Sequence, residues 1–190
     1  MKKQKIFALS IIAIMLALVV GGSSAFFATS GVAHNVITTG GVDIELIEDT
    51  DVIGEDGRPV PFVNIEGATP GQRISKMPRI KNVDDGEVYV RMRVSSYVEF
   101  MNGGVNKVAF ANAFSPDLSR SWSYRDGYYY YMYPLAKGET TRALFTTVTI
   151  PKTLANDDQG AKYTIRIHGE AVQTANNGAT VFEAQGWPGE

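Results

Sequence analysis

Histidine and cysteine set the limits on the chemistry that this chain can do. It has two histidines, His34 and His168, and no cysteine. The common zinc proteases place two histidines one helical turn apart, with a glutamate that activates the bound water, and neither histidine lies in such a motif. The sequence also lacks the Gly-x-Ser-x-Gly motif of many serine hydrolases. We therefore expect a non-enzymatic protein with no catalytic residue, no metal ligand and no cofactor.

Two pairs of neighbouring aspartates are the remaining candidate metal ligands. Asp84-Asp85 and Asp157-Asp158 both fall in predicted loops, where carboxylate oxygens could bind Ca²⁺. Loop aspartates more often form turns by hydrogen bonding to the nearby backbone. We expect turn formers and keep a structural calcium site as the alternative.

A run of aromatic residues offers a second kind of surface. In a strand, alternation places Tyr128, Tyr130 and Met132 on one face and Tyr129, Tyr131 and Tyr133 on the other. The exposed face of such a strand could stack on sugar rings. The favoured interpretation is that one set fills the core and the other covers an edge or an interface, since tyrosine combines a large apolar ring with a polar tip.

The N-terminus is typical of a secretory signal peptide. Three lysines in the first five residues precede an apolar run over residues 6–20, and Ser23-x-Ala25 supplies the small side chains that a signal peptidase accepts. The run is shorter than the roughly 20 residues that a membrane-spanning helix needs. We predict cleavage between Ala25 and Phe26, with an uncleaved membrane anchor as the alternative.

Charge and cysteine content limit the classes of function that fit the chain after the predicted loss of residues 1–25. The full chain has a formal charge of −2, and loss of residues 1–25 removes three lysines and leaves 15 basic against 20 acidic residues, or −5. Such an acidic domain lacks the basic surface that binds nucleic acid. With no disulfide, the domain must be held by its core, and a domain of about 150 residues is large enough for that.

Residues 26–41 form the segment most informative about mechanism. It has no charged residue other than His34 when protonated, and it combines two phenylalanines with small and β-branched residues. Such a segment is suited to pairing along an exposed sheet edge. We predict that it is an assembly strand that adds to the next subunit, and pairing within its own domain is the alternative. The residues assigned to this role are Phe26, Phe27, Val32, Val36, Ile37, Thr38 and Thr39.

An assembly strand needs a sheet to pair with, and the residues after 41 are predicted to form the strands of such sheets. Alternation predicts strands at residues 42–46, 87–100, 144–150 and 162–172, two aromatic strands around Asp126-Gly127, and a short strand within 59–65, while the acidic stretch 48–58 is predicted to be a loop. Pro70-Gly71 predicts a tight turn. Residues 110–114 fit either a short helix or an irregular insertion.

Eight to ten short strands with frequent turns are typical of an all-β, two-sheet sandwich, of either the jelly-roll or the immunoglobulin-like type. The predicted organisation is a signal peptide at 1–25, an N-terminal donor-strand or linker segment at 26–41, and a β-sandwich domain at 42–190.

Several short motifs, taken in their order and spacing, resemble the TasA and camelysin group of exported matrix proteins. They are Gly21-Gly22-Ser23-Ser24-Ala25-Phe26-Phe27, Val36-Ile37-Thr38-Thr39-Gly40, Thr69-Pro70-Gly71-Gln72-Arg73-Ile74-Ser75-Lys76, Lys81-Asn82, Tyr89-Val90-Arg91-Met92-Arg93-Val94, Asp126-Gly127-Tyr128-Tyr129-Tyr130-Tyr131, Pro134-Leu135-Ala136-Lys137-Gly138-Glu139-Thr140-Thr141, Leu144-Phe145-Thr146, Glu170-Ala171-Val172-Gln173-Thr174 and Gly186-Trp187. Together they extend over most of the chain.

The resemblance implies a Gram-positive bacterial protein, processed by a dedicated signal peptidase and secreted to the extracellular matrix or cell surface as a fibre subunit of the biofilm matrix. Its partners would be other copies of itself, joined head to tail, and related matrix subunits, with the membrane involved only before cleavage. Camelysin-type relatives are described as casein-cleaving metalloproteases, an activity that His34 and His168 do not support. A monomeric module that binds a surface glycan or protein is the main alternative.

Overall fold

The computed structural model describes residues 27–33, 42–100, 104–150 and 162–188. In these ranges the chain forms twelve strands and one short helix, which confirms the all-β prediction. The strands are β1 (Phe27–Ala33), β2 (Ile44–Ile53), β3 (Pro59–Pro61), β4 (Ile65–Ala68), β5 (Arg73–Ser75), β6 (Met77–Asn82), β7 (Val88–Glu99), β8 (Val105–Val108), β9 (Trp122–Arg125), β10 (Tyr128–Tyr131), β11 (Thr147–Thr149) and β12 (Lys162–Gln173), and the helix is α2 (Phe110–Phe114).

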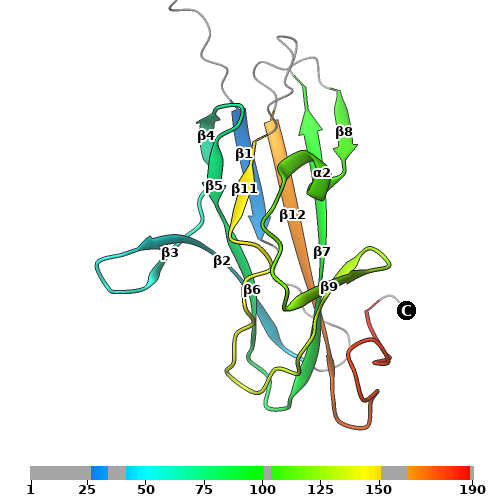
Figure 1. The fold of residues 1–190 in the computed structure, drawn as a ribbon. Helices are drawn as coiled ribbons and strands as arrows, with labels where there is room; N and C mark the ends of the chain where they lie inside the picture. Colours follow the sequence, from blue (N-terminus) through cyan, green and yellow to red (C-terminus); the bar gives the residue numbers. More distant parts are fainter. Residues whose placement is uncertain (1–26, 34–41, 101–103, 151–161, 189–190) are drawn as a thin grey trace, which may run out of the picture.

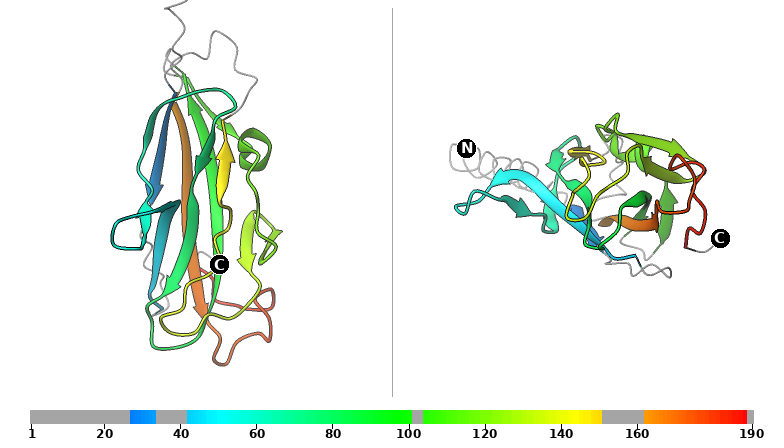
Figure 2. Two further views of the ribbon diagram at one scale, coloured as in Figure 1. Left: turned by 60° about the vertical axis from the view of Figure 1, so that its left-hand side comes forward. Right: turned by 90° about the horizontal axis from the view of Figure 1, so that it is seen from below.

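A seven-stranded sheet forms the larger part of the molecule (Figure 1). Its strand order is β4-β1-β12-β7-β10-β9, and β8 pairs with β7 beside β10. The long antiparallel pair of β7 and β12 runs in unbroken register from Glu99 opposite Lys162 to Val88 opposite Gln173. This pair forms the centre of the sheet, and Figure 2 shows the two strands side by side along the length of the molecule.

The other strands form a three-stranded sheet, β3-β2-β6, and a two-stranded sheet, β11-β5. Residues 135–146 run beside β6 and are tied to it by backbone hydrogen bonds: Thr141 N–H donates to Ile80 O at 2.8 Å and Leu144 N–H to Pro78 O at 3.0 Å. These bonds satisfy backbone groups of the segment that would otherwise be buried without a partner.

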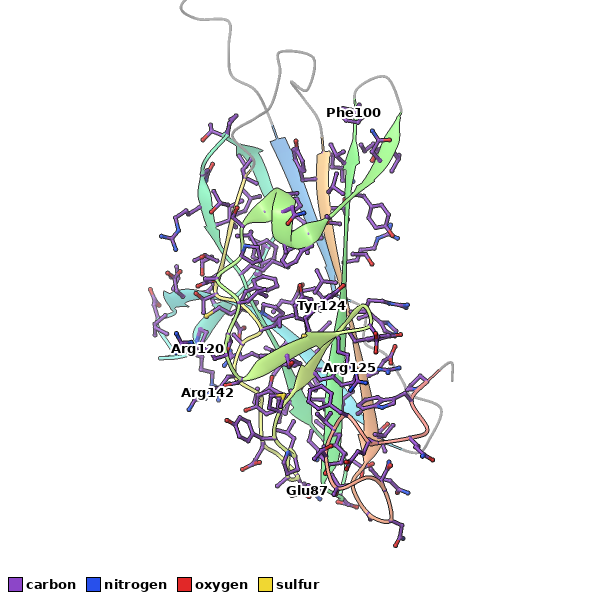
Figure 3. The ribbon with its side chains drawn as sticks, turned by 45° about the vertical axis from the view of Figure 1, so that its right-hand side comes forward. Glu87, Phe100, Arg120, Tyr124, Arg125 and Arg142 are labelled. Atoms are coloured by element: carbon purple, nitrogen blue, oxygen red, sulfur yellow. The ribbon has the colours of Figure 1, made fainter. Side chains whose placement is uncertain are left out.

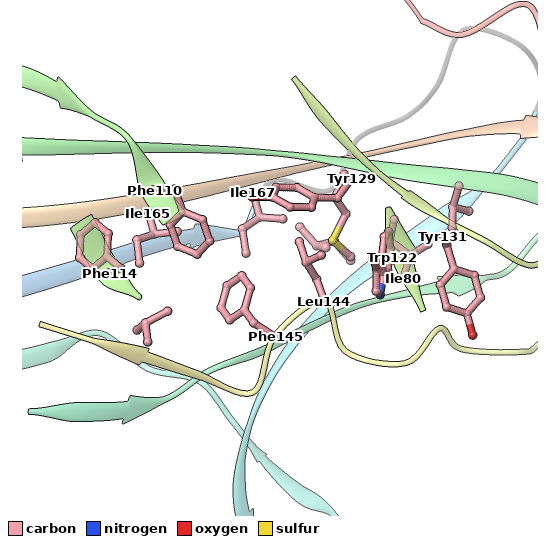
Figure 4. Packing of buried hydrophobic residues seen from close by; sticks show 14 of the residues in the cluster. Ile80, Phe110, Phe114, Trp122, Tyr129, Tyr131, Leu144, Phe145, Ile165 and Ile167 are labelled. Carbon is pink, nitrogen blue, oxygen red and sulfur yellow. The ribbon is translucent and has the colours of Figure 1, made fainter. Parts of the chain in front are cut away.

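Between these sheets lies one main hydrophobic core (Figure 4). Its members come from both sides and include the fully buried Ile80, Met92, Leu144, Phe145 and Ile165. Helix α2 adds Phe110 and Phe114, and the Phe110 ring lies 5.1 Å from that of Phe145. The alternation predicted for β7 holds on this side, because Val88, Val90 and Met92 are buried in the core.

The predicted turns are confirmed. Gln72 N–H donates to Thr69 O at 3.0 Å, and Gly71 between them has φ +80°. In the β9–β10 hairpin, Asp126 and Gly127 have φ values of +51° and +86°, which is the conformation that a two-residue hairpin turn requires. The 110–114 segment is helical rather than an irregular insertion.

The prediction of a loop over residues 48–58 is wrong for its first half. Strand β2 continues through these acidic residues to Ile53. Glu48 is neutralised by an ion pair with Lys76 at 2.8 Å, and Asp49 by Arg79 on the neighbouring strand β6. Only the tip from Gly54 to Arg58 turns, with Gly54 N–H donating to Arg58 O.

Candidate assembly site

The first strand occupies an unusual place in the large sheet. Strand β1 lies between β4 and β12, rather than beside β2, which follows it in the chain (Figure 1). Ala28 to Ala33 take Lys162 to Ile167 as successive partners, and this pairing is parallel. All the other strand pairs of the described residues are antiparallel. The β1 strand thus runs in the same direction as β12 and opposite to β4, and its pairing with β12 is the one parallel pairing among the described strands.

Both edges of the space that β1 fills depend on it. In the described part of the chain, β4 pairs with no strand other than β1, through Phe27 opposite Ala68 and Thr29 opposite Ile65. On the other side, β12 turns Tyr163, Ile165 and Ile167 into the core. Withdrawal of β1 would expose one edge of β12 and leave β4 without a partner strand. We call this space, bounded by β12 and β4, the β1 slot.

The predicted assembly residues divide into two groups. Phe27 and Val32 belong to β1, with Val32 in register with Arg166. Phe26, Val36, Ile37, Thr38 and Thr39, and the cleavage residue Ala25, lie outside the described residues. Within this single chain, β1 makes the alternative pairing, inside its own domain. Sequence alternation alone does not identify β4 and β12 as the partners of β1.

Chain length permits β1 to pair elsewhere. Ten residues separate the end of β1 at Ala33 from the start of β2 at Ile44. At roughly 3.3–3.6 Å per residue, such a connection reaches up to about 35 Å. That reach is comparable with the width of a small domain, so the length of the connection does not restrict β1 to the slot of its own chain.

The outer face of the large sheet carries a second, smaller core that the sequence did not reveal. Residues 174–188 fold back over this face and bury Trp187 against Tyr89, Tyr130 and Val172. Trp187 Nε1–H donates to Ala184 O at 3.0 Å, and its ring meets that of Tyr130 edge-on. We call residues 174–188 the C-terminal strap.

Beneath the strap lies a buried ion pair. Arg91 Nε donates to Glu170 Oε2 at 2.7 Å, and the two side chains are only 2% and 3% exposed. The guanidinium also lies over Tyr128 at 3.9 Å and over Trp187 at 4.4 Å. Arg91 lies on the face of β7 opposite the main core, and the strap covers that face. The Trp near the C-terminus was the one available sign of it.

The other candidate residues that the structure describes do not gather into a catalytic or metal site. His168 lies at the edge of the buried ion pair, with Nε2 3.3 Å from Glu170 Oε1, while His34 and Asp157-Asp158 lie outside the described residues. Asp84 accepts hydrogen bonds from the backbone of Gly86 and Asp43, as a turn former does, and Asp85 pairs with Lys137. No group of three potential metal-ligating side chains occurs in the described ranges.

The tyrosine run packs inside the molecule on both faces. Tyr129 and Tyr131 belong to the main core, while Tyr130 is buried in the smaller core with Tyr128 packed against it. The alternation is therefore as predicted, and the strap covers the face that was assigned to an edge or an interface. Met132 and Tyr133, beyond the end of β10, remain exposed.

A buried lysine marks the junction of β2 with β5 and β6. Lys76 is fully buried, with Nζ 2.8 Å from Glu48 Oε1 and 3.9 Å from the centre of the Phe62 ring. Desolvation lowers the pKa of Lys76, and the attraction and hydrogen bond of Glu48 oppose that shift. This pair fixes the base of the β2–β3 hairpin.

The described residues contain no helix long and apolar enough to cross a membrane. Comparison of the chain with protein-family models, with curated proteins and with solved structures gave no match. The arrangement of β1 between β4 and β12 therefore stands as the principal structural guide to function.

Proposed function

We propose that this chain is a secreted structural subunit of an extracellular matrix fibre, of the TasA and camelysin kind, and that it assembles by strand addition. The observation that carries the proposal is the parallel insertion of β1 between β4 and β12. The same strand bears Phe27 and Val32, which were assigned to assembly from the sequence. We further propose that the two-sheet sandwich is of the jelly-roll or immunoglobulin-like type.

The mechanism follows from the identity of the subunits. A slot that accepts residues 27–33 of its own chain also accepts the same residues of another copy, because backbone pairing and register are the same. Such an exchange joins the N-terminal segment of one subunit to the sheet of the next. The contact is heterologous, and heterologous contacts extend into open filaments unless their rotation closes a ring.

Signal peptide removal controls the exchange in this proposal. Until the bond between Ala25 and Phe26 is cut, the segment that precedes β1 remains at the membrane, and β1 has little freedom to reach another subunit. N-terminal sequencing of the exported protein should give Phe26 as the first residue. A start at Met1 would make the protein membrane-anchored and would contradict this control.

A disulfide lock tests the exchange, because the natural chain has no cysteine. Ser30 and Thr164 are partners in register. Neighbouring strands lie about 4.8 Å apart, which is within the Cα separation that a disulfide allows. The oxidised Ser30→Cys/Thr164→Cys variant should lose the filaments that the parent forms in negative-stain microscopy, and reductant should restore them. The matched control, Ser95→Cys/Arg166→Cys, joins β7 to β12 and should form filaments in both states.

A mixture of single-cysteine variants tests directly whether β1 of one chain pairs with β12 of another. When Ser30→Cys and Thr164→Cys proteins assemble together and are then oxidised, disulfides should form between chains and appear as dimers on a non-reducing gel. Filaments that form without any such cross-link would show that β1 stays in its own slot, and the strand-addition mechanism would be rejected.

A further inference from the structure

The β2–β3 hairpin projects from the body of the molecule as an arm (Figures 1 and 2). Its outer part carries large apolar side chains that face solvent: Val52 and Ile53 are 57% and 59% exposed, and Val60 opposite them is 37% exposed. Apolar side chains gathered on a projecting element are a common feature of interaction sites.

The free edge of this arm is blocked against strand pairing. Val60 O accepts a hydrogen bond from Thr50 Oγ1, and Phe62 N–H donates to Glu48 O, so these two residues direct their backbone groups toward β2. The alternating residues Pro59 and Pro61 therefore face outward, where proline has no N–H to offer. The arm is thus suited to contacts through its side chains rather than its backbone.

On the opposite side of the molecule, the large sheet has a gap. Strand β7 pairs with β10 through Arg91 and Met92 and with β8 from Ser96 onward, so its edge at residues 93–95 faces neither strand. A cleft of about 610 Å³ opens there. Its walls are the start of α2 with Phe110, the side chain of Leu118, and the β9–β10 hairpin with Tyr124. Figure 3 shows Tyr124 on this hairpin, facing the space below α2.

The cleft and the arm match in polarity and in charge. The cleft is mostly apolar, Tyr124 on its wall is 64% exposed, and Arg93 is the one charged residue among the described residues that line it. No carboxylate of the described part of the chain forms an ion pair with Arg93, whose guanidinium lies 5.4 Å from the Tyr128 ring. The arm offers exposed carboxylates at Asp51, Glu55 and Asp56 against the single cation Arg58.

We propose that the arm of one copy seats in the cleft of a second copy, with Val52 and Ile53 against the apolar wall and an arm carboxylate beside Arg93. Because the arm and the β9–β10 hairpin that walls the cleft lie on opposite sides of the molecule (Figure 1), a chain cannot fill its own cleft, and the contact propagates from copy to copy. The contact is separate from β1 exchange and can act beside it, as a second set of contacts between subunits.

The test uses the full mature chain with the oxidised Ser30→Cys/Thr164→Cys lock, so that association cannot arise from β1 exchange. If β1 does not exchange between copies, the disulfide has no effect on association, and the experiment still measures the contact between arm and cleft. Sedimentation velocity over a range of concentrations should show self-association. Ile53→Ser and Tyr124→Ala should each weaken it at least about tenfold, equal to about 1.4 kcal/mol. Val83→Ser, an exposed valine away from both surfaces, should leave it unchanged.

A mixture distinguishes this contact from general stickiness. The Ile53→Ser protein keeps its cleft and the Tyr124→Ala protein keeps its arm, so an equal mixture should form dimers and nothing larger. Circular dichroism verifies that both variants are folded, as expected for exposed positions. A locked parent that stays monomeric at all concentrations would overturn the proposal, as would variants that associate like the parent or a mixture without dimers.

Discussion

Replacement of Trp187 by alanine tests whether the C-terminal strap is an integral part of the fold. The Trp187 side chain is 3% exposed and contacts the Arg91 guanidinium and the Tyr130 ring, while its Nε1–H bonds to Ala184 O. The substitution removes all three contacts at once. It also uncovers the ion pair of Arg91 with Glu170, which lies beneath the strap.

The expected loss can be worked out from burial. A tryptophan buries about 150–250 Å², which at about 25 cal/mol per Å² amounts to about 4–6 kcal/mol. Residual burial in the unfolded chain reduces this to about 3–5 kcal/mol, the range found for removal of large aromatic side chains. For a chain of this length, the midpoint of thermal unfolding should fall by about 6–20 °C.

Urea unfolding followed by far-ultraviolet circular dichroism measures the change, since this signal does not depend on the tryptophan that is removed. Trp187→Phe keeps the packing on Tyr130 and should lose less than Trp187→Ala. Tyr133→Ala removes an exposed aromatic side chain and should stay within about 0.5 kcal/mol of the parent. A loss below about 1 kcal/mol for Trp187→Ala would refute the reasoning and indicate that the strap rests on the sheet without supporting it.

Three further predictions concern the rest of the fold. Lys76→Met leaves the buried Glu48 without its partner and should cost about 3–5 kcal/mol in urea unfolding, whereas the double variant Lys76→Met/Glu48→Met should recover most of that loss. Burial raises the pKa of Asp117, but hydrogen bonds from the side chain of Thr146 and from the backbone outweigh it and hold the pKa below its usual value. Its contribution to stability is therefore present above the unfolded pKa of about 3.9 and is lost as pH falls through the lower folded value, and Asp117→Asn should flatten the thermal midpoint across that acidic window. Gly127→Ala, at φ +86°, should cost about 1–2 kcal/mol by thermal unfolding, while Gly86→Ala, where φ is not positive and contacts are ordinary, serves as the control.

Local chemistry explains which parts of the fold the sequence predicted well. Asp126-Gly127 is a hairpin turn because both residues tolerate positive φ, and β7 alternates because one of its faces meets the core. These properties depend on a few neighbouring residues. The burial of the other face of β7, which carries Arg91, depends instead on Trp187, which lies far along the chain, so local alternation does not reveal it.

Long-range pairing explains what the sequence could not supply about the candidate site. The composition of residues 26–41 predicted a strand that pairs along the edge of a sheet, and part of that segment, β1, is a strand. Its partners β4 and β12, and its parallel direction, are properties of the whole sheet. In β2, the acidic residues Glu48 and Asp49 predicted a loop because their cationic partners lie on other segments.

The pairing of β1 with β12 also has a consequence for folding kinetics. It joins the first described strand to the last, with nearly the whole domain between them in the sequence. The sequence separation of the two strands is therefore very large. Such contacts form slowly, because the chain must lose the entropy of closing a long loop before the strand pairing can stabilise it. Under the proposed strand addition, the slot of a chain that is still folding can be filled by the β1 strand of another copy. The concentration of the protein during folding would then decide between closed monomers and the proposed filaments.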